Sequence, residues 1–197
     1  MAKFSKSIQA EPVIHIWDEQ LTHSDGLGGG YLDTTELDAS VGTGYVDKGC
    51  PLYLDYSTKK AHVVKGGTVV TGSTTTKTRI TKPHLFKVGD IVAVTGKIAV
   101  AITAIDTTTS TEYDILTHLT NTTAYTAGAV LVEAKTAGAS AVEKYTANCV
   151  LLNTRYIETG ADAPCVFRID QWTEKSRYTY AMSDATISAL SPNIEIK

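Results

Sequence analysis

A cluster of glycines at residues 26–30 is the first stretch whose residue types could bind a ligand through the backbone. Glycine-rich loops hold phosphate and Mg²⁺ when they end in Gly-Lys followed by Ser or Thr. The cluster lacks that ending, and no apolar strand directly precedes it. We therefore interpret residues 26–30 as a surface loop, and we predict no cofactor.

Histidines could ligate a metal or act as general bases, but their spacing favours neither role. They are His15, His23, His62, His84 and His118. None lies at the i, i+2 or i, i+4 spacing from another that short-range metal pairs use. The run His23-Ser24-Asp25 holds the side-chain types of a hydrolase triad, but a triad is assembled from distant chain positions. The sequence predicts no metal site and no catalytic site.

Carboxylates are present in short acidic elements such as Thr-Glu-Leu-Asp at residues 35–38. Nothing in the sequence marks two of them as facing each other, as the paired carboxylates of a glycosidase must. Calcium binding by Asp side chains and backbone carbonyls in loops stays an alternative, although no calcium loop of the form Asp-x-Asp-x-Asp-Gly is present. We predict that the protein is not an enzyme. A deep pocket lined by two convergent titratable groups would be the sign of the opposite.

Two tryptophans are the residues that we expect to contact a partner, because Trp and Tyr are preferred anchors of protein interfaces. Trp17 shares one face of an expected strand over residues 12–17 with Val13 and His15. Trp172 lies in the C-terminal segment. We predict partner binding by Val13, His15, Trp17 and Trp172. Exposed coplanar aromatic residues would instead form a platform for glycans.

The overall composition excludes several partners. The 197 residues carry a net charge of −3, which provides no positive field to attract nucleic acid or an anionic membrane. The N-terminus has no apolar signal region, and eighteen apolar residues never run together. Cys50, Cys149 and Cys165 are odd in number and far apart, so we expect buried thiols in a reducing compartment rather than a disulfide framework.

Short strands separated by turn signals are the dominant pattern along the chain. The 30 threonines favour strands, because Thr is β-branched and suits a pleated surface. Residues 51–56 and 60–64 predict a hairpin in which Leu52 and Leu54 share one face. Further strands are expected at residues 68–70, 77–81, 113–116, 129–133, 149–152, 165–171 and 178–182.

The stretch Lys82–Val94 predicts a loop at the corner of a barrel or sandwich. Leu85, Phe86, Ile91 and Val94 are the expected core residues, and Gly89-Asp90 is the expected turn. His84 and Lys87 are interpreted as loop residues. The following run, residues 98–106, is apolar or small on both faces, so we predict a central strand that is buried on both sides.

These patterns predict an all-β protein with a small β-barrel or β-sandwich module. We expect an N-terminal arm and loop over residues 1–44, the module over 45–134, and a C-terminal β-rich segment over 135–197 that packs on the module or on a partner. Residues 21–44 are interpreted as loop, and residues 134–147 as a linker or one or two helical turns. At most one short helix is expected, capped by Ser183-Asp184 and running through Leu190.

Four short phrases between Gly49 and Glu133 carry a resemblance to a known group of proteins. They are Gly-Cys-Pro-Leu-Tyr-Leu-Asp at residues 49–55, Lys-Pro-His-Leu-Phe-Lys-Val-Gly-Asp-Ile-Val at 82–92, Ile-Thr-Ala-Ile-Asp at 102–106 and Ala-Gly-Ala-Val-Leu-Val-Glu-Ala at 127–134. In these phrases and their rhythm the chain resembles the β-module of capsid-associated proteins of tailed bacteriophages. This group includes head decoration, cement and head-fibre proteins, among them those of crAss-like phages.

The resemblance implies a structural virion protein, made in the host cytoplasm, that docks on the capsid and stabilises it or anchors head fibres. It implies the major capsid protein and other virion proteins as partners, and a homo-oligomer, with a trimer as one option. The flanks, residues 1–44 and 140–197, depart from the resemblance. Because of these flanks, a portal- or tail-associated protein is one alternative. A glycan-binding module of a phage fibre, which would use clustered Tyr and Trp residues, is the other.

Overall fold

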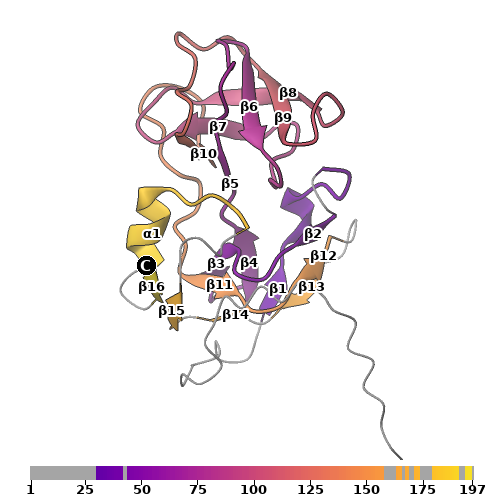
Figure 1. Ribbon diagram of the computed structural model, residues 1–197. Helices are drawn as coiled ribbons and strands as arrows, with labels where there is room; N and C mark the ends of the chain where they lie inside the picture. The colour runs from indigo at the N-terminus through magenta and orange to yellow at the C-terminus, as the bar shows by residue number, and fades with distance from the viewer. Residues whose placement is uncertain are drawn as a thin grey trace, which may run out of the picture.

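The computed structural model describes residues 30–41, 44–157, 163–165, 167–168, 171–173, 179–190 and 194–196. Two six-stranded sheets contain most of the strands (Figure 1). They confirm the prediction of an all-β fold with a barrel and one short helix. Of the expected N-terminal arm and loop over residues 1–44, residues 1–29 lie outside the described residues.

The first sheet has the order β13-β1-β4-β3-β11-β14. Its strands are β1 (Gly30–Leu32), β3 (Pro51–Asp55), β4 (Lys60–Val63), β11 (Cys149–Leu151), β13 (Ala163–Cys165) and β14 (Phe167–Arg168). Strands β3 and β4 form the predicted antiparallel hairpin, and Leu52 and Leu54 are buried on its inner face. Strand β1 pairs with β4 in parallel, and the other pairs of this sheet are antiparallel.

The second sheet is antiparallel throughout and has the order β5-β10-β7-β8-β9-β6. Its strands are β5 (Gly66–Thr68), β6 (Lys77–Thr81), β7 (Ile91–Val94), β8 (Val100–Asp106), β9 (Tyr113–His118) and β10 (Val130–Glu133). The two edge strands meet through a bridge between Val69 and Ile80, and Val70 N donates to Arg79 O at 2.8 Å. These contacts close the curled sheet into a small barrel, drawn in the upper half of Figure 1.

Small elements complete the described structure. Strand β2 (Tyr45–Val46) pairs with β12 (Arg155–Tyr156), and β15 (Gln171–Thr173) pairs with β16 (Ile194–Ile196). A 3₁₀ turn η1 (Thr34–Glu36) follows β1. Helix α1 (Asp184–Leu190) begins as predicted after Ser183, whose Oγ accepts a hydrogen bond from Thr186 N at 3.0 Å.

Each sheet has its own core. Under the first sheet lie Leu32, Leu37, Val46, Cys50, Leu52, Leu54, Ala61, Val63, Leu85, Cys149, Leu151, Ile157 and Tyr180. Inside the barrel lie Val69, Ile80, Phe86, Val92, Val100, Ile102, Leu116, Tyr125 and Leu131. Leu85 and Phe86 are adjacent in the chain but belong to different cores, so the loop before β7 connects the two. Ile91 and Val94, also expected in the core, are half-buried.

The strand pairing divides the chain differently from the expected boundaries at residues 44 and 134. Strands β3 and β4, placed by the prediction in the module, pair with β1 and β11 from its two flanks. The barrel itself spans β5 to β10. Hydrophobic alternation identifies a strand but not the sheet to which it belongs, because pairing partners lie far apart in sequence.

Three local predictions were wrong. Residues 30–36 were expected to be loop but form β1 and η1, because β1 inserts beside β4 and Tyr31 N donates to Lys59 O at 2.9 Å. The C-terminal part of β8 is not buried on both sides: Thr103 and Ala104 are exposed on the outside of the barrel, after a bulge. The expected strand at 178–182 is absent from its described residues, 179–182.

Candidate functional site

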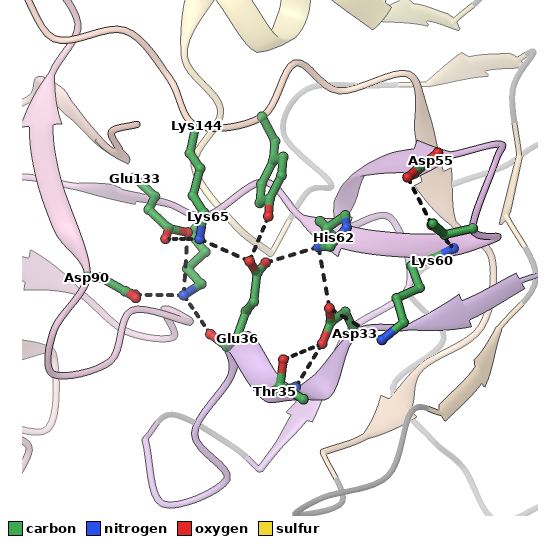
Figure 2. A network of polar contacts seen from close by, with 12 residues as sticks. Asp33, Thr35, Glu36, Asp55, Lys60, His62, Lys65, Asp90, Glu133 and Lys144 are labelled. Atoms are coloured by element: carbon green, nitrogen blue, oxygen red, sulfur yellow. Dashed lines mark hydrogen bonds and ion pairs between the residues drawn. The ribbon is translucent and has the colours of Figure 1, made fainter. Parts of the chain in front are cut away.

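A buried lysine lies where the chain passes from the first sheet to the barrel. Lys65 falls between β4 and β5, and its side chain is 0% exposed. Its Nζ lies 2.6 Å from Asp90 Oδ2 and donates to the backbone oxygen of Glu36 at 2.7 Å. Glu133 Oε2 lies 3.4 Å away on another side (Figure 2). The ammonium group is therefore enclosed by two carboxylates and a carbonyl.

The barrel topology explains why these three side chains meet. Lys65 immediately precedes β5, Asp90 immediately precedes β7, and Glu133 is the last residue of β10. Strand β10 lies between β5 and β7 and is antiparallel to both. The start of β5, the end of β10 and the start of β7 consequently lie at the same end of the barrel, the end that faces the first sheet (Figure 1).

Lys144 and Glu36 extend the contacts toward the first sheet. Lys144 Nζ lies 2.8 Å from Glu133 Oε1 and 3.0 Å from Glu36 Oε1. Tyr145 Oη donates to Glu36 Oε1 at 2.6 Å. We call the set Glu36, Lys65, Asp90, Glu133 and Lys144 the ionic junction, because it joins η1 of the first-sheet side to three strands of the barrel.

Aromatic and acidic side chains flank the ionic junction on the side of the first sheet. His62 Nδ1 lies 3.2 Å from Glu36 Oε2 and 3.7 Å from Asp33 Oδ2. The rings of Tyr53, His62 and Tyr145 stack on one another, with 4.6 Å between the centroids of His62 and Tyr145. These contacts hold Tyr145 and His62 in position against Glu36. Figure 2 shows His62 beside Glu36 and Asp33.

Burial and pairing shift the pKa values of the ionic junction in different directions. Burial raises the pKa of Glu133, and the attraction of Lys65 only partly offsets it. Burial acts on Glu36 in the same sense, but hydrogen bonds from Tyr145 and Lys144 outweigh it and its pKa lies below the ordinary value. Burial opposes the charge of Lys144, yet its hydrogen bonds to the two glutamates raise its pKa. Of the two glutamates, Glu133 holds a proton the more readily.

A second buried polar group involves the predicted corner loop. His84 is in a loop as expected, but its side chain is fully buried and its Nε2 lies 2.9 Å from Asp114 Oδ2. Its Nδ1 accepts a hydrogen bond from Phe86 N at 3.2 Å. Burial lowers the pKa of His84, and the attraction of Asp114 opposes the shift without cancelling it. The contacts of His84 with Phe86 N and Asp114 therefore stabilise the loop.

Two open grooves lie outside the ionic junction. The larger, of about 780 Å³, is lined mainly by threonines and small side chains of β5, β7 and β10 and by residues 179–185. The smaller, of about 460 Å³, lies beside residues 121–126 and 96–98. Among the described residues, no group of three or more His, Cys, Asp or Glu side chains is arranged to hold a metal ion.

The predicted partner-binding residues are not brought together in the described structure. Val13, His15 and Trp17 lie outside the described residues. Trp172 lies in β15, where its backbone is in register with Glu195 of β16. The partner surface therefore stays a prediction.

No sequence pattern predicted the ionic junction. Asp90 was interpreted only as a turn residue and Glu133 only as the end of a strand, while Lys65 was given no role. One signal was present: Lys65 is a single charge within Val-Val-Lys-Gly-Gly, a run otherwise apolar or small. A charge in such a run must find partners when its neighbours are buried.

Comparisons with known proteins place the chain in no family. No protein-family model, curated protein or solved structure matches it. Within the described residues, no helix has the length and apolar character needed to span a membrane.

Proposed function

We propose that this chain is a structural protein of a tailed-phage particle. It docks on the capsid as an auxiliary or decoration protein and stabilises the head or anchors head fibres. Its partners are the major capsid protein, other virion proteins and further copies of itself. The proposal takes the chain to be made in the host cytoplasm and to act without catalysis.

The main observation that supports the proposal is the set of contacts within the ionic junction. Its charged groups contact one another at 2.6–3.4 Å and connect the two sheets, an arrangement that suits mechanical cohesion. Asp90 and Glu133 belong to two of the phrases that resemble phage capsid-associated proteins. Leu85 and Phe86, which connect the two cores, belong to one of these phrases as well. The resemblance thus falls on residues that hold the fold together.

Purified particles provide the test. Particles of the phage that encodes the chain are separated on a density gradient, digested and analysed by mass spectrometry. We expect the chain at a fixed ratio to the major capsid protein. Gold-labelled antibody then locates it, and labelling over the head surface distinguishes a decoration protein from a portal or tail component. A chain missing from purified particles would refute the proposal.

Glycan binding on a fibre is the second candidate function, favoured by an exposed tyrosine that packs against a half-buried one. Tyr156 of β12 is 74% exposed, and its ring meets Tyr45 of β2 edge to face with centroids 6.2 Å apart. Tyrosine offers an apolar ring and a hydroxyl group together. A glycan array should show binding that Tyr156→Ala removes and that Tyr56→Ala, a change at a separate exposed tyrosine, leaves unchanged. An array without binding would exclude this function.

A further inference from the structure

The contact between Lys65 and Asp90 places an amine directly against a carboxyl group in a site closed to solvent. Lys65 Nζ lies 2.6 Å from Asp90 Oδ2, and the two side chains are 0% and 5% exposed. Glu133, 6% exposed, lies 3.4 Å from the same Nζ through Oε2, a buried oxygen with no hydrogen-bond partner among the described residues. The site therefore brings together the amine of Lys65, the carboxyl group of Asp90 that it can attack, and the carboxyl group of Glu133, which can transfer protons.

We propose that Lys65 and Asp90 join covalently in an intramolecular isopeptide bond, and that Glu133 promotes the reaction. The product is an amide between the side chains of the two residues. It connects the start of β5 to the start of β7 across the end of β10, so the bond locks three adjacent strands at the end of the barrel that faces the first sheet.

The reaction balances without any oxidant, reductant or co-reactant. Transfer of one proton from Nζ to the Asp90 carboxylate converts the ion pair into a neutral amine and a neutral acid. The nitrogen lone pair attacks Cγ of Asp90 and forms the C–N bond. Glu133 accepts a proton from the nitrogen and delivers one to the departing hydroxyl group, which leaves as water. The C=O bond re-forms, and Glu133 ends in its starting state.

Burial favours each part of this reaction. A buried ion pair loses hydration that its mutual attraction only partly replaces, so proton transfer to the neutral, reactive pair is less costly here than in water. The closed site also excludes the water that would drive the amide back to acid and amine. The raised pKa of Glu133 suits a group that must hold a proton temporarily.

Lys144 provides a counter-ion for Glu133 after the amide has formed. Amide formation neutralises Lys65 and Asp90 together and would leave the Glu133 carboxylate without Lys65 as a counter-ion. Lys144 Nζ lies 2.8 Å from Glu133 Oε1, so the carboxylate keeps a cation. The backbone oxygen of Glu36, 2.7 Å from Nζ, is positioned to accept the remaining N–H of the amide. No uncompensated charge is left in the site.

Intact-mass measurement of the purified, denatured full-length chain tests the proposal. We expect a mass lower than that of the sequence by one water molecule. Trypsin cleaves after a free lysine but not after an acylated one, so digestion should yield residues 61–77 joined to residues 88–97. A chain with its full mass and normal cleavage after Lys65 overturns the proposal. A cross-link from Lys65 to Glu133 instead overturns the assignment of Asp90.

Variants separate the cross-link from other losses of water. Lys65→Arg keeps the positive charge but lacks the primary amine, so it should retain the full mass while its circular dichroism stays that of a folded β protein. Loss of water that persists in Lys65→Arg indicates a cyclised aspartate and refutes the isopeptide bond. Glu133→Gln should lower the cross-linked fraction at early times after a pulse of synthesis. A wild-type rate in Glu133→Gln refutes the role of Glu133.

Discussion

Leu85 and Phe86, adjacent residues in the loop before β7, pack in two different cores. The loop is irregular, so Leu85 can pack under the first sheet while Phe86 fills the barrel. Phe86 is 0% exposed. The role of this loop therefore depends on two side chains that point in different directions.

Truncation of Phe86 tests the barrel core. Phe86→Ala should lower the free energy of unfolding by about 3–5 kcal/mol, because it removes a large buried ring and leaves a cavity. Val88→Ala in the same loop is the control: Val88 is 54% exposed, so its loss should stay within about 0.5 kcal/mol. Urea titration measures both values. Equal losses would show that Phe86 is not a core residue.

His84 should make stability depend on pH near its ordinary pKa of 6.5. Burial lowers its folded-state pKa, so below 6.5 the unfolded chain binds a proton that the folded chain does not. The contribution is full above 6.5 and is lost as the pH falls through 6.5 toward the lower folded pKa. Unfolding free energies measured across this window should decline toward acid more gently in His84→Gln than in wild type. Parallel profiles would contradict this assignment.

Local features determine where α1 begins and which residues of β8 are exposed. Ser183 caps the start of α1 and also donates a hydrogen bond to Glu143 Oε1, so the cap connects the helix to the segment that follows β10. Strand β8 is central in its sheet, but a bulge between Ile102 and Ala104 interrupts its alternation, so Thr103 and Ala104 are both exposed. Burial within a central strand therefore depends on local irregularities as well as on the position of the strand in the sheet.

The helix cap can be tested against a control in the same helix. Ser183→Ala should reduce the free energy of unfolding by about 1 kcal/mol or somewhat more, because Thr186 N and Glu143 both lose a partner. Ser188 is exposed within α1. Ser188→Ala should leave the free energy of unfolding unchanged or raise it by roughly a few tenths of a kcal/mol, because Ala has the higher helix propensity. Thermal and urea unfolding compare the two. A destabilised Ser188→Ala with an unaffected Ser183→Ala would reverse the assignment.

At the scale of the described molecule, the ionic junction connects the core under the first sheet to the core of the barrel. The backbone oxygen of Glu36 accepts a hydrogen bond from Lys65, and its carboxylate contacts Lys144 and Tyr145. In the same turn, Lys87 Nζ donates a hydrogen bond to Thr35 O at 2.7 Å. These contacts connect the first-sheet side to the barrel at several points. We expect the two sheets to unfold in one cooperative transition.

Removal of Glu36 tests this connection. Glu36→Ala removes the carboxylate partner of Tyr145 and one of the two carboxylates that contact Lys144, so the free energy of unfolding should fall by about 1.5–3 kcal/mol. Glu112→Ala removes an exposed carboxylate from a barrel loop and should cost less than about 0.5 kcal/mol. Denaturant titration gives both values. A loss no larger in Glu36→Ala than in Glu112→Ala would show that the connection contributes nothing.

The sequence by itself determined the features that depend on near neighbours. Alternation of Leu52 and Leu54 predicted the hairpin, and Ser183 predicted the start of α1, because both signals act within a few residues. The turn at Gly89 was likewise predictable, since Gly89 adopts a positive φ of 94°.

Only the tertiary structure decided which strands share a sheet and which charges meet. Lys65 and Asp90 are 25 residues apart, and Lys65 and Glu36 are 29 apart. Their contact requires β5, β10 and β7 to lie side by side with their ends aligned, and no local pattern encodes that order. Strand order and barrel closure arise from packing over the whole chain, so the ionic junction became visible only in the folded molecule.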